Sequence, residues 1–175
     1  MASYIFYINK RTKNLDKETL SLEKKTIKHS KTVMSRIMMP HQANSVGNVH
    51  GGEIIKFMDE TAYVVARKHS HHNCVTARVD ELQFLLPIYV DNLTTCRAHL
   101  IFVGKSSMQV KVKVEVQDLE SDQKTKIALT AFFTMVALDK NGCPVKVPGL
   151  ILKTEEEKTA YKHGEKRYQS YKKKN

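Results

Sequence analysis

A carboxylate occupies an unexpected place in the stretch GNVHGGEIIKFMDE, residues 47–60. When residues 51–70 are placed on a helix at about 100° per residue, Glu60 falls on the polar side and Asp59 on the border of the apolar stripe. A carboxylate against an apolar wall loses hydration and therefore accepts a proton more readily. The position suits a general base. A border aspartate can also merely hydrogen-bond the backbone, and the spacing alone leaves both interpretations open.

The start of this helix offers a second group for chemistry. Gly51 and Gly52 would let a ligand approach the backbone closely, because neither residue has a side chain. The first N–H groups of a helix have no internal acceptor, and the helix dipole adds positive potential there. These groups could polarise a carbonyl or hold an oxyanion. A glycine turn with only a steric role is an equally good interpretation of the pair.

The segments on either side of the helix are typical of strands. The clearest is 107–117, where Met108 and the alternate residues after it are apolar while Gln109 and its alternates are polar, so one face should be buried and the other solvated. Thr154 and Glu157 have the spacing of a capping box and predict a solvated C-terminal helix. The other expected strands are 31–39, 74–88, 93–104 and 126–138.

This order of one strand, one long helix and four strands predicts an α+β fold with an antiparallel sheet and the helix on one face. We expect three regions: a basic N-terminal extension over 1–30, the folded domain over 31–152, and a basic helix or tail over 153–175. A single helix cannot cover both faces of such a sheet. Dimerisation is therefore the expected way to bury the remaining apolar surface.

The net charge of +11 lies mostly at the two ends of the chain. Residues 1–31 carry +5, residues 153–175 carry +4 and the middle only +2. A nucleic-acid-binding fold more often carries its charge on a face of the core, so we favour solubilising tails and expect no nucleic-acid partner. Binding of nucleic acid through the basic ends remains a distant alternative.

The composition also bears on the compartment. The three cysteines are too few and too scattered for a disulfide framework and suit a reducing environment. The N-terminus lacks the charged start and the cleavage site of a signal peptide, and no apolar run is long enough to span a bilayer. We therefore expect a cytoplasmic protein without integral membrane contact.

Two motifs together resemble those of a known family. The run Asn48-Val49-His50-Gly51-Gly52 followed by Met58-Asp59-Glu60 is similar to the signature of hotdog-fold acyl-CoA thioesterases, in the branch of the bacterial broad-range enzymes and the animal cytosolic acyl-CoA hydrolases. The resemblance continues through VDELQFLLP (79–87) and VGKSS (103–107) and covers roughly residues 32–148. It implies a hotdog fold, in which an antiparallel sheet wraps around one central helix. It also implies dimers that pair sheet edge to edge, an active site at the dimer interface, and frequent assembly as trimers of dimers.

The resemblance also implies roles for individual residues in hydrolysis of acyl-CoA to a free fatty acid and CoA. Asp59 would act as general base on water, or less readily as a nucleophile. Asn48 of the partner subunit would face it and position the water or the thioester, and backbone N–H near Gly52 would polarise the carbonyl. Coenzyme A would enter as part of the substrate, so no separate cofactor is expected. The remaining substrate contacts would come from His50, Gly51, Gly104, Lys105, Ser106 and Ser107. The last three of these also fit an ordinary turn between strands.

Other residues could in principle support different chemistry. The run from His69 to Cys74 contains three histidines, but no second ligand group follows at a useful spacing, so a polar helix end is favoured over a metal site. Cys74 begins a strand pattern, where a buried cysteine is commoner than a nucleophile. The main alternative function is a non-catalytic hotdog module that binds acyl-CoA as a sensor.

Overall fold

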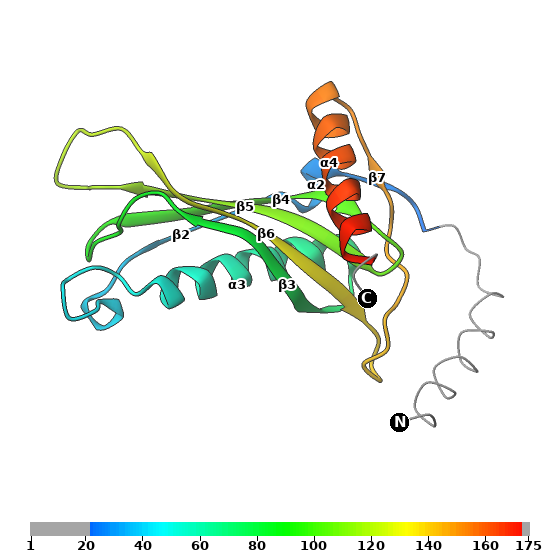
Figure 1. The fold of residues 1–175 in the computed structure, drawn as a ribbon, viewed down its shortest axis with the longest axis horizontal. Helices are drawn as coiled ribbons and strands as arrows, with labels where there is room; N and C mark the ends of the chain where they lie inside the picture. Colours follow the sequence, from blue (N-terminus) through cyan, green and yellow to red (C-terminus); the bar gives the residue numbers. More distant parts are fainter. Residues whose placement is uncertain (1–21, 173–175) are drawn as a thin grey trace.

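The computed structural model describes residues 22–172 and has the predicted order of elements (Figure 1). A strand, a long helix and four strands follow one another, and the helix has the expected bounds. No helix in this part of the chain is both long and apolar enough to cross a bilayer. The elements are β1 (Lys25–Thr26), α2 (Ile27–Ser30), β2 (Thr32–Ile37), the 3₁₀ turn η2 (Pro40–Gln42), α3 (Gly51–Ser70), β3 (Asn73–Phe84), β4 (Leu93–Val103), β5 (Ser107–Gln117), β6 (Lys126–Leu138), β7 (Leu150–Ile151) and α4 (Glu155–Lys172).

The main sheet has five strands in the order β2-β4-β5-β6-β3, and every neighbouring pair is antiparallel. It curves around α3, which is the hotdog arrangement predicted from the sequence (Figure 1). Within residues 22–172, the strand directly after the helix, β3, pairs only with β6 and therefore forms one edge of the sheet. Its exposed apolar side chains include Val75, Val79 and Phe84. An open edge of this kind is a template for pairing with another strand.

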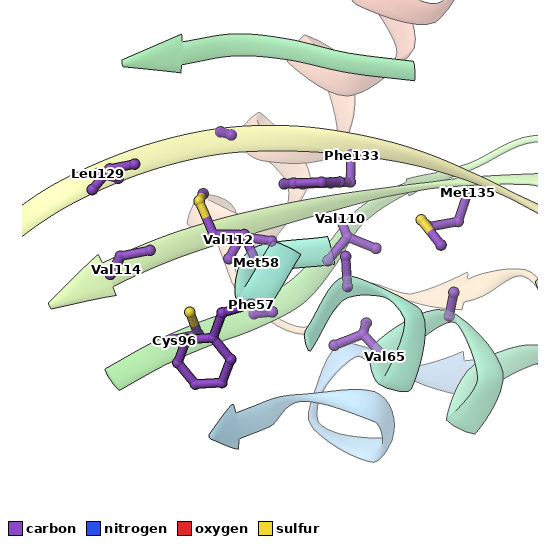
Figure 2. Packing of buried hydrophobic residues seen from close by; sticks show 14 of the residues in the cluster. Phe57, Met58, Val65, Cys96, Val110, Val112, Val114, Leu129, Phe133 and Met135 are labelled. Carbon is purple, nitrogen blue, oxygen red and sulfur yellow. The ribbon is translucent and has the colours of Figure 1, made fainter. Parts of the chain in front are cut away.

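The core lies between α3 and the concave face of the sheet (Figure 2). The alternation predicted for 107–117 is confirmed on this face, since Met108, Val110, Val112 and Val114 of β5 are fully buried. On α3 the buried stripe contains Met58, Ala62, Val65 and Ala66. Burying each large apolar side chain contributes roughly 1.5–3 kcal/mol. This packing fixes the rotation of α3 and hence the direction in which Asp59 points.

The other face of the sheet is contacted toward one end by α4, so one side of this helix is packed, whereas the sequence predicted a solvated helix (Figure 1). The capping box is present, since Thr154 Oγ1 accepts from Glu157 N at 3.1 Å and Glu157 Oε2 accepts from Thr154 N at 3.3 Å. However, the Phe102 ring packs against two tyrosines of α4, and a Cβ at Gly164 would lie only 2.6 Å from Phe102 Cβ. The close approach also buries Gln109, which the alternation had placed on the solvated face.

A short parallel pairing of β1 with β7 joins the start of the described chain to the segment just before α4, beside the end of α3. The side chain of His69, in the last turn of α3, is fully buried there. Its Nε2 donates to the Pro148 carbonyl at 2.7 Å, and Lys25 Nζ donates to the His69 carbonyl at 2.7 Å. Burial lowers the pKa of His69, because the charged ring would lose its hydration.

We expect this buried histidine to make folding stability depend on pH. Unfolded His69 titrates with its ordinary pKa of 6.5, whereas the folded chain takes up this proton only at lower pH. The stabilisation from neutral His69 is therefore complete above the unfolded pKa of 6.5. It is lost as the pH falls from there through the lower pKa of the folded state. In thermal unfolding from about pH 7.5 to about pH 5, His69→Gln should show a smaller loss than wild type, because glutamine keeps a donor for Pro148. An identical pH dependence in the two proteins would contradict this. His99, whose pKa burial also lowers, should account for part of the slope that remains.

Candidate active site

Asp59 lies on the sheet-facing border of α3, at the mouth of an open pocket of about 550 Å³. Its Oδ1 accepts a short hydrogen bond from the hydroxyl of Thr76 on β3. The rest of the lining is largely apolar: Met34, Glu60, Tyr63, Val64, Cys74, Val75 and Met135. A carboxylate held by a hydroxyl beside an apolar pocket can take a proton from water close to an apolar substrate.

Thr76 distinguishes Asp59 from its neighbour. Glu60 is half-buried and borders the same pocket, although the helical projection had placed it on the solvated side. No hydrogen bond or ion pair fixes the Glu60 carboxylate within residues 22–172, whereas Thr76 orients that of Asp59. Thr76 had not been singled out from the sequence. It lies 17 residues after Asp59, and only the pairing of β3 with β6 brings it beneath the helix.

The loop before α3 is closed on itself by an asparagine that the sequence analysis also missed. Asn44 Oδ1 accepts from Val46 N at 3.0 Å and from Asn48 N at 3.1 Å, and Asn44 N donates to Asn48 O at 2.7 Å. Both asparagines line a second pocket of about 210 Å³, together with Gly51 and Phe84. The Asn44 amide nitrogen has no acceptor among the described residues, so it can donate to a ligand.

The two glycines at the helix start have different surroundings. A Cβ at Gly51 would lie 3.0 Å from the Phe84 ring, so this glycine has a steric role. At Gly52 a Cβ would meet nothing within 4 Å, and the backbone there is open to an incoming ligand. The backbone N–H groups of both residues lack an acceptor in the described chain, since the first helical bonds run from Glu53 and Ile54 to His50. The His50 side chain is exposed and does not cap the helix.

Within one chain the two pockets remain separate. Gly51 and Asp59 are eight residues apart on α3, or about 12 Å of helix. The pocket lined by Asn44 and Asn48, called the asparagine pocket below, therefore lies at the start of the helix, about two turns before the carboxylate. A single subunit does not bring Asn48 and Asp59 to one reacting atom. This separation is what a site completed by a second subunit would require.

The predicted CoA-binding loop, 104–107, joins β4 to β5 and lines neither pocket. Its backbone is held from both sides, since Lys105 O accepts from Val147 N and Ser106 O accepts from Ala137 N, each at 3.0 Å. The Lys105 side chain is exposed, whereas Ser107 is buried. In the sheet register, Ser107 pairs with Val136, which pairs with Val75 of β3. The loop therefore lies two strands from Thr76, or roughly 10 Å.

The cysteines and the histidines near the end of α3 are the groups that could have supported other chemistry. Cys74 is buried, and burial raises the pKa of its thiol, so it is a poor nucleophile at neutral pH. Burial raises the pKa of Cys96 to about 12. His69 is buried while His71 and His72 are exposed, and no three potential metal ligands converge anywhere between residues 22 and 172.

Comparison with known proteins identifies the family of this chain. A family model of the thioesterase superfamily matches residues 46–121. The uncharacterized acyl-CoA thioester hydrolase YkhA of Bacillus subtilis is 36% identical over 135 residues, which are 77% of this chain and 78% of that protein. The chain belongs to the acyl-CoA thioester hydrolases. It also matches the cytosolic acyl coenzyme A thioester hydrolase of Mus musculus, with 34% identity over 90% of the chain, but spans only 42% of that longer relative.

The chain is also similar to solved structures of acyl-CoA hydrolases and thioesterases. A Staphylococcus aureus acyl-CoA hydrolase in complex with coenzyme A superposes with a TM-score of 0.80 at 30% identity, covering 87% of this chain and 91% of that one. That structure carries an alanine in place of an asparagine, and related structures of the same enzyme carry alanine in place of an aspartate or a threonine. An apo-hexameric acyl-CoA thioesterase also gives 0.80, at 30% identity, covering 86% and 97% of the two chains.

Proposed function

We propose that this chain hydrolyses acyl-CoA thioesters to a free carboxylic acid and CoA. The observation that carries the proposal is the Asp59 carboxylate, oriented by Thr76 at the mouth of an apolar pocket. The relatives named acyl-CoA thioester hydrolases and the S. aureus hydrolase with bound coenzyme A support the same substrate class.

The proposed reaction uses Asp59 of one subunit and the helix start of its partner. Asp59 takes a proton from water as the water oxygen attacks the thioester carbonyl carbon. The carbonyl oxygen becomes an oxyanion, which the open N–H groups at the helix start, from Gly51 of the partner subunit and Gly52 of the partner subunit, stabilise. The intermediate then collapses, the carbon–sulfur bond breaks, and the proton from Asp59 passes to the departing CoA sulfur. The acid and CoA leave, and Asp59 is again ionised.

We infer that an asparagine of the loop 44–48 completes this site. In the S. aureus enzyme, the replaced asparagine, aspartate and threonine follow one another at intervals of 15 and 17 residues. Asn44, Asp59 and Thr76 of this chain have both intervals. This favours Asn44 over the initially predicted Asn48 as the amide that faces the substrate. Asn48 would then hold the loop, through its hydrogen bonds with Asn44.

We further propose that the site is shared between subunits. The two pockets of one chain are about 12 Å apart along α3, and pairing of β3 edges would place the asparagine pocket of one subunit opposite Asp59 of the other. Several related enzymes are described as hexameric, which supports a trimer of dimers for this chain. The exposed residues of β3 would then be buried in the interface.

The CoA moiety would lie along the basic and hydroxyl-bearing groups near this interface. CoA carries phosphates, and Lys105 offers an exposed cation for them. In this proposal Gly104, Ser106 and Ser107 shape the loop, while His50 and Gly51 contact the substrate at the helix start. Because relatives are named cytosolic, we propose that the reaction takes place in the cytoplasm.

Thiol release from a series of acyl-CoAs of increasing chain length tests the proposal. Turnover of at least one substrate, with release of stoichiometric free acid, is expected. Binding of acyl-CoA without thiol release from any member of the series would overturn the hydrolase and leave the acyl-CoA-binding module in its place.

Two alanine variants separate the roles of the asparagines. Asn44→Ala should lower kcat by roughly 10- to 100-fold, the effect of removing a charge-assisted hydrogen bond of about 1.5–3 kcal/mol. Asn48→Ala should leave kcat closer to wild type, because its backbone makes the bonds that close the loop. Steady-state kinetics on both variants check this. A larger loss in Asn48→Ala than in Asn44→Ala would return the catalytic role to Asn48.

A further inference from the structure

The segment of β3 that follows Thr76 departs from regular strand geometry. Its register with β6 shifts twice, between Thr76 and Arg78 and between Asp80 and Gln83. Within the second shift, Glu81 has φ 50°. A residue other than glycine in this left-handed region is strained by about 1–3 kcal/mol, and such a conformation persists only where its surroundings hold it.

The surroundings that hold it come from the last turns of α4. The Arg167 guanidinium donates to Glu81 Oε1 from two nitrogens, at 3.0 Å and 2.9 Å, and lies 3.9 Å above the Phe132 ring. The Arg167 side chain is only 16% exposed and the Glu81 side chain 60% exposed, so the two parallel donor bonds and the packing of the arginine on Phe132 fix this contact.

A second contact holds the other end of the irregular segment. The Arg78 guanidinium lies 3.7 Å from the centre of the Tyr171 ring, and Arg78 Nε donates to Asp80 Oδ1 at 2.5 Å. Burial, and next to it the Asp80 carboxylate, raise the pKa of Tyr171 to about 12. The tyrosine hydroxyl therefore stays protonated beside Asp80 across the neutral range. Two residues of α4 thus hold β3: Tyr171 contacts Arg78, and Arg167 contacts Glu81. These two contacts together are called the grip below.

We propose that Arg167 and Tyr171 are positioning residues that hold β3 so that Thr76 can orient the Asp59 carboxylate. This inference rests on the function proposed above. Thr76 lies at the first register shift, directly before the segment that α4 holds, and α4 packs on the face of the sheet opposite α3 (Figure 1). Releasing the grip would let β3 relax toward regular pairing and would move the threonine hydroxyl away from the carboxylate.

Kinetics on graded variants test the proposal. Arg167→Gln and Tyr171→Leu should each lower kcat, and the double variant should lower it by roughly 10- to 100-fold, as expected of a small misplacement of reacting groups. KM should change little. Lys166→Ala, an exposed cation next to Arg167 on the same helix, is the matched control and should keep the wild-type kcat. A double variant with wild-type kcat would overturn the proposal.

A cycle with Thr76→Val shows whether the grip acts through the threonine. If it does, adding Arg167→Gln to Thr76→Val should produce little further loss, because the two changes remove one interaction. Losses that multiply independently would refute action through Thr76.

Hydrogen exchange provides a readout that does not depend on turnover. In the double variant, exchange of the β3 amides should accelerate while that of β5 stays unchanged. Unchanged β3 exchange would contradict the grip itself. Conversely, accelerated β3 exchange in a protein whose wild type releases no thiol would remove the proposed hydrolase but leave the grip in place.

Discussion

Replacing Asp59 with asparagine should lower kcat for thiol release by roughly 10²–10⁴-fold, the contribution typical of a general base. This corresponds to about 3–5 kcal/mol of transition-state stabilisation. Asparagine has nearly the same shape, and its amide oxygen can still accept from Thr76, so the pocket should keep its form. The variant loses only the ability to accept the proton from water. Steady-state kinetics on the best substrate, with CoA affinity measured by calorimetry, should show a lower kcat and unchanged binding.

The matched control for this change is one position away. Glu60→Gln removes a carboxylate that borders the same pocket but has no partner to orient it among the residues described. Its kcat should stay close to that of wild type. A loss in Glu60→Gln as large as that in Asp59→Asn would show that the pocket needs negative charge in general and would remove the specific role of Asp59.

Replacing Phe133 with alanine should lower the free energy of unfolding by about 3–5 kcal/mol. The ring is fully buried at the centre of the core, between β3 and β5 in the sheet register, and faces α3 (Figure 2). Its removal leaves a cavity that the surrounding sheet can fill only in part. Denaturant unfolding at fixed protein concentration measures the change, because association with other subunits would otherwise alter the midpoint.

The neighbouring Phe132 provides the comparison for this variant. It is the same residue type on the opposite face of β6, half-buried under Arg167. Phe132→Ala should therefore cost less than Phe133→Ala, losing partial burial and a cation–π contact of about 0.5–1 kcal/mol. Equal losses at the two positions would contradict the assignment of Phe133 to the centre of the core.

The sequence predicted those elements whose signals are local. The apolar stripe and the glycine pair defined both ends of α3, and the alternation from Met108 identified β5 and its buried face. Gln109 was placed on the wrong side of this pattern. Its burial depends on α4 docking over the sheet, some fifty residues later in the chain, and no alternation within a strand reports such a contact.

The candidate site was predicted in part for a similar reason. Asp59 was found because its position on the helix border is visible in a helical projection. Thr76 looks like any strand threonine until β3 is paired with β6, which sets its hydroxyl beside the helix. Asn44 is one of several polar residues in a turn-rich loop. Its role in closing that loop depends on backbone geometry that spacing does not encode.

The distance between the asparagine pocket and Asp59 on one chain has a consequence for mixed assemblies. If each reaction centre takes its carboxylate from one subunit and its amide from the other, Asn44→Ala and Asp59→Asn damage different halves of it. Co-refolding equal amounts of the two impaired proteins would then create hybrid dimers that hold one fully intact centre and one doubly damaged centre. With random pairing, about a quarter of all centres would be intact. Two impaired preparations would thus regain close to a quarter of the native turnover when combined, because each subunit supplies the half of the centre that the other lacks.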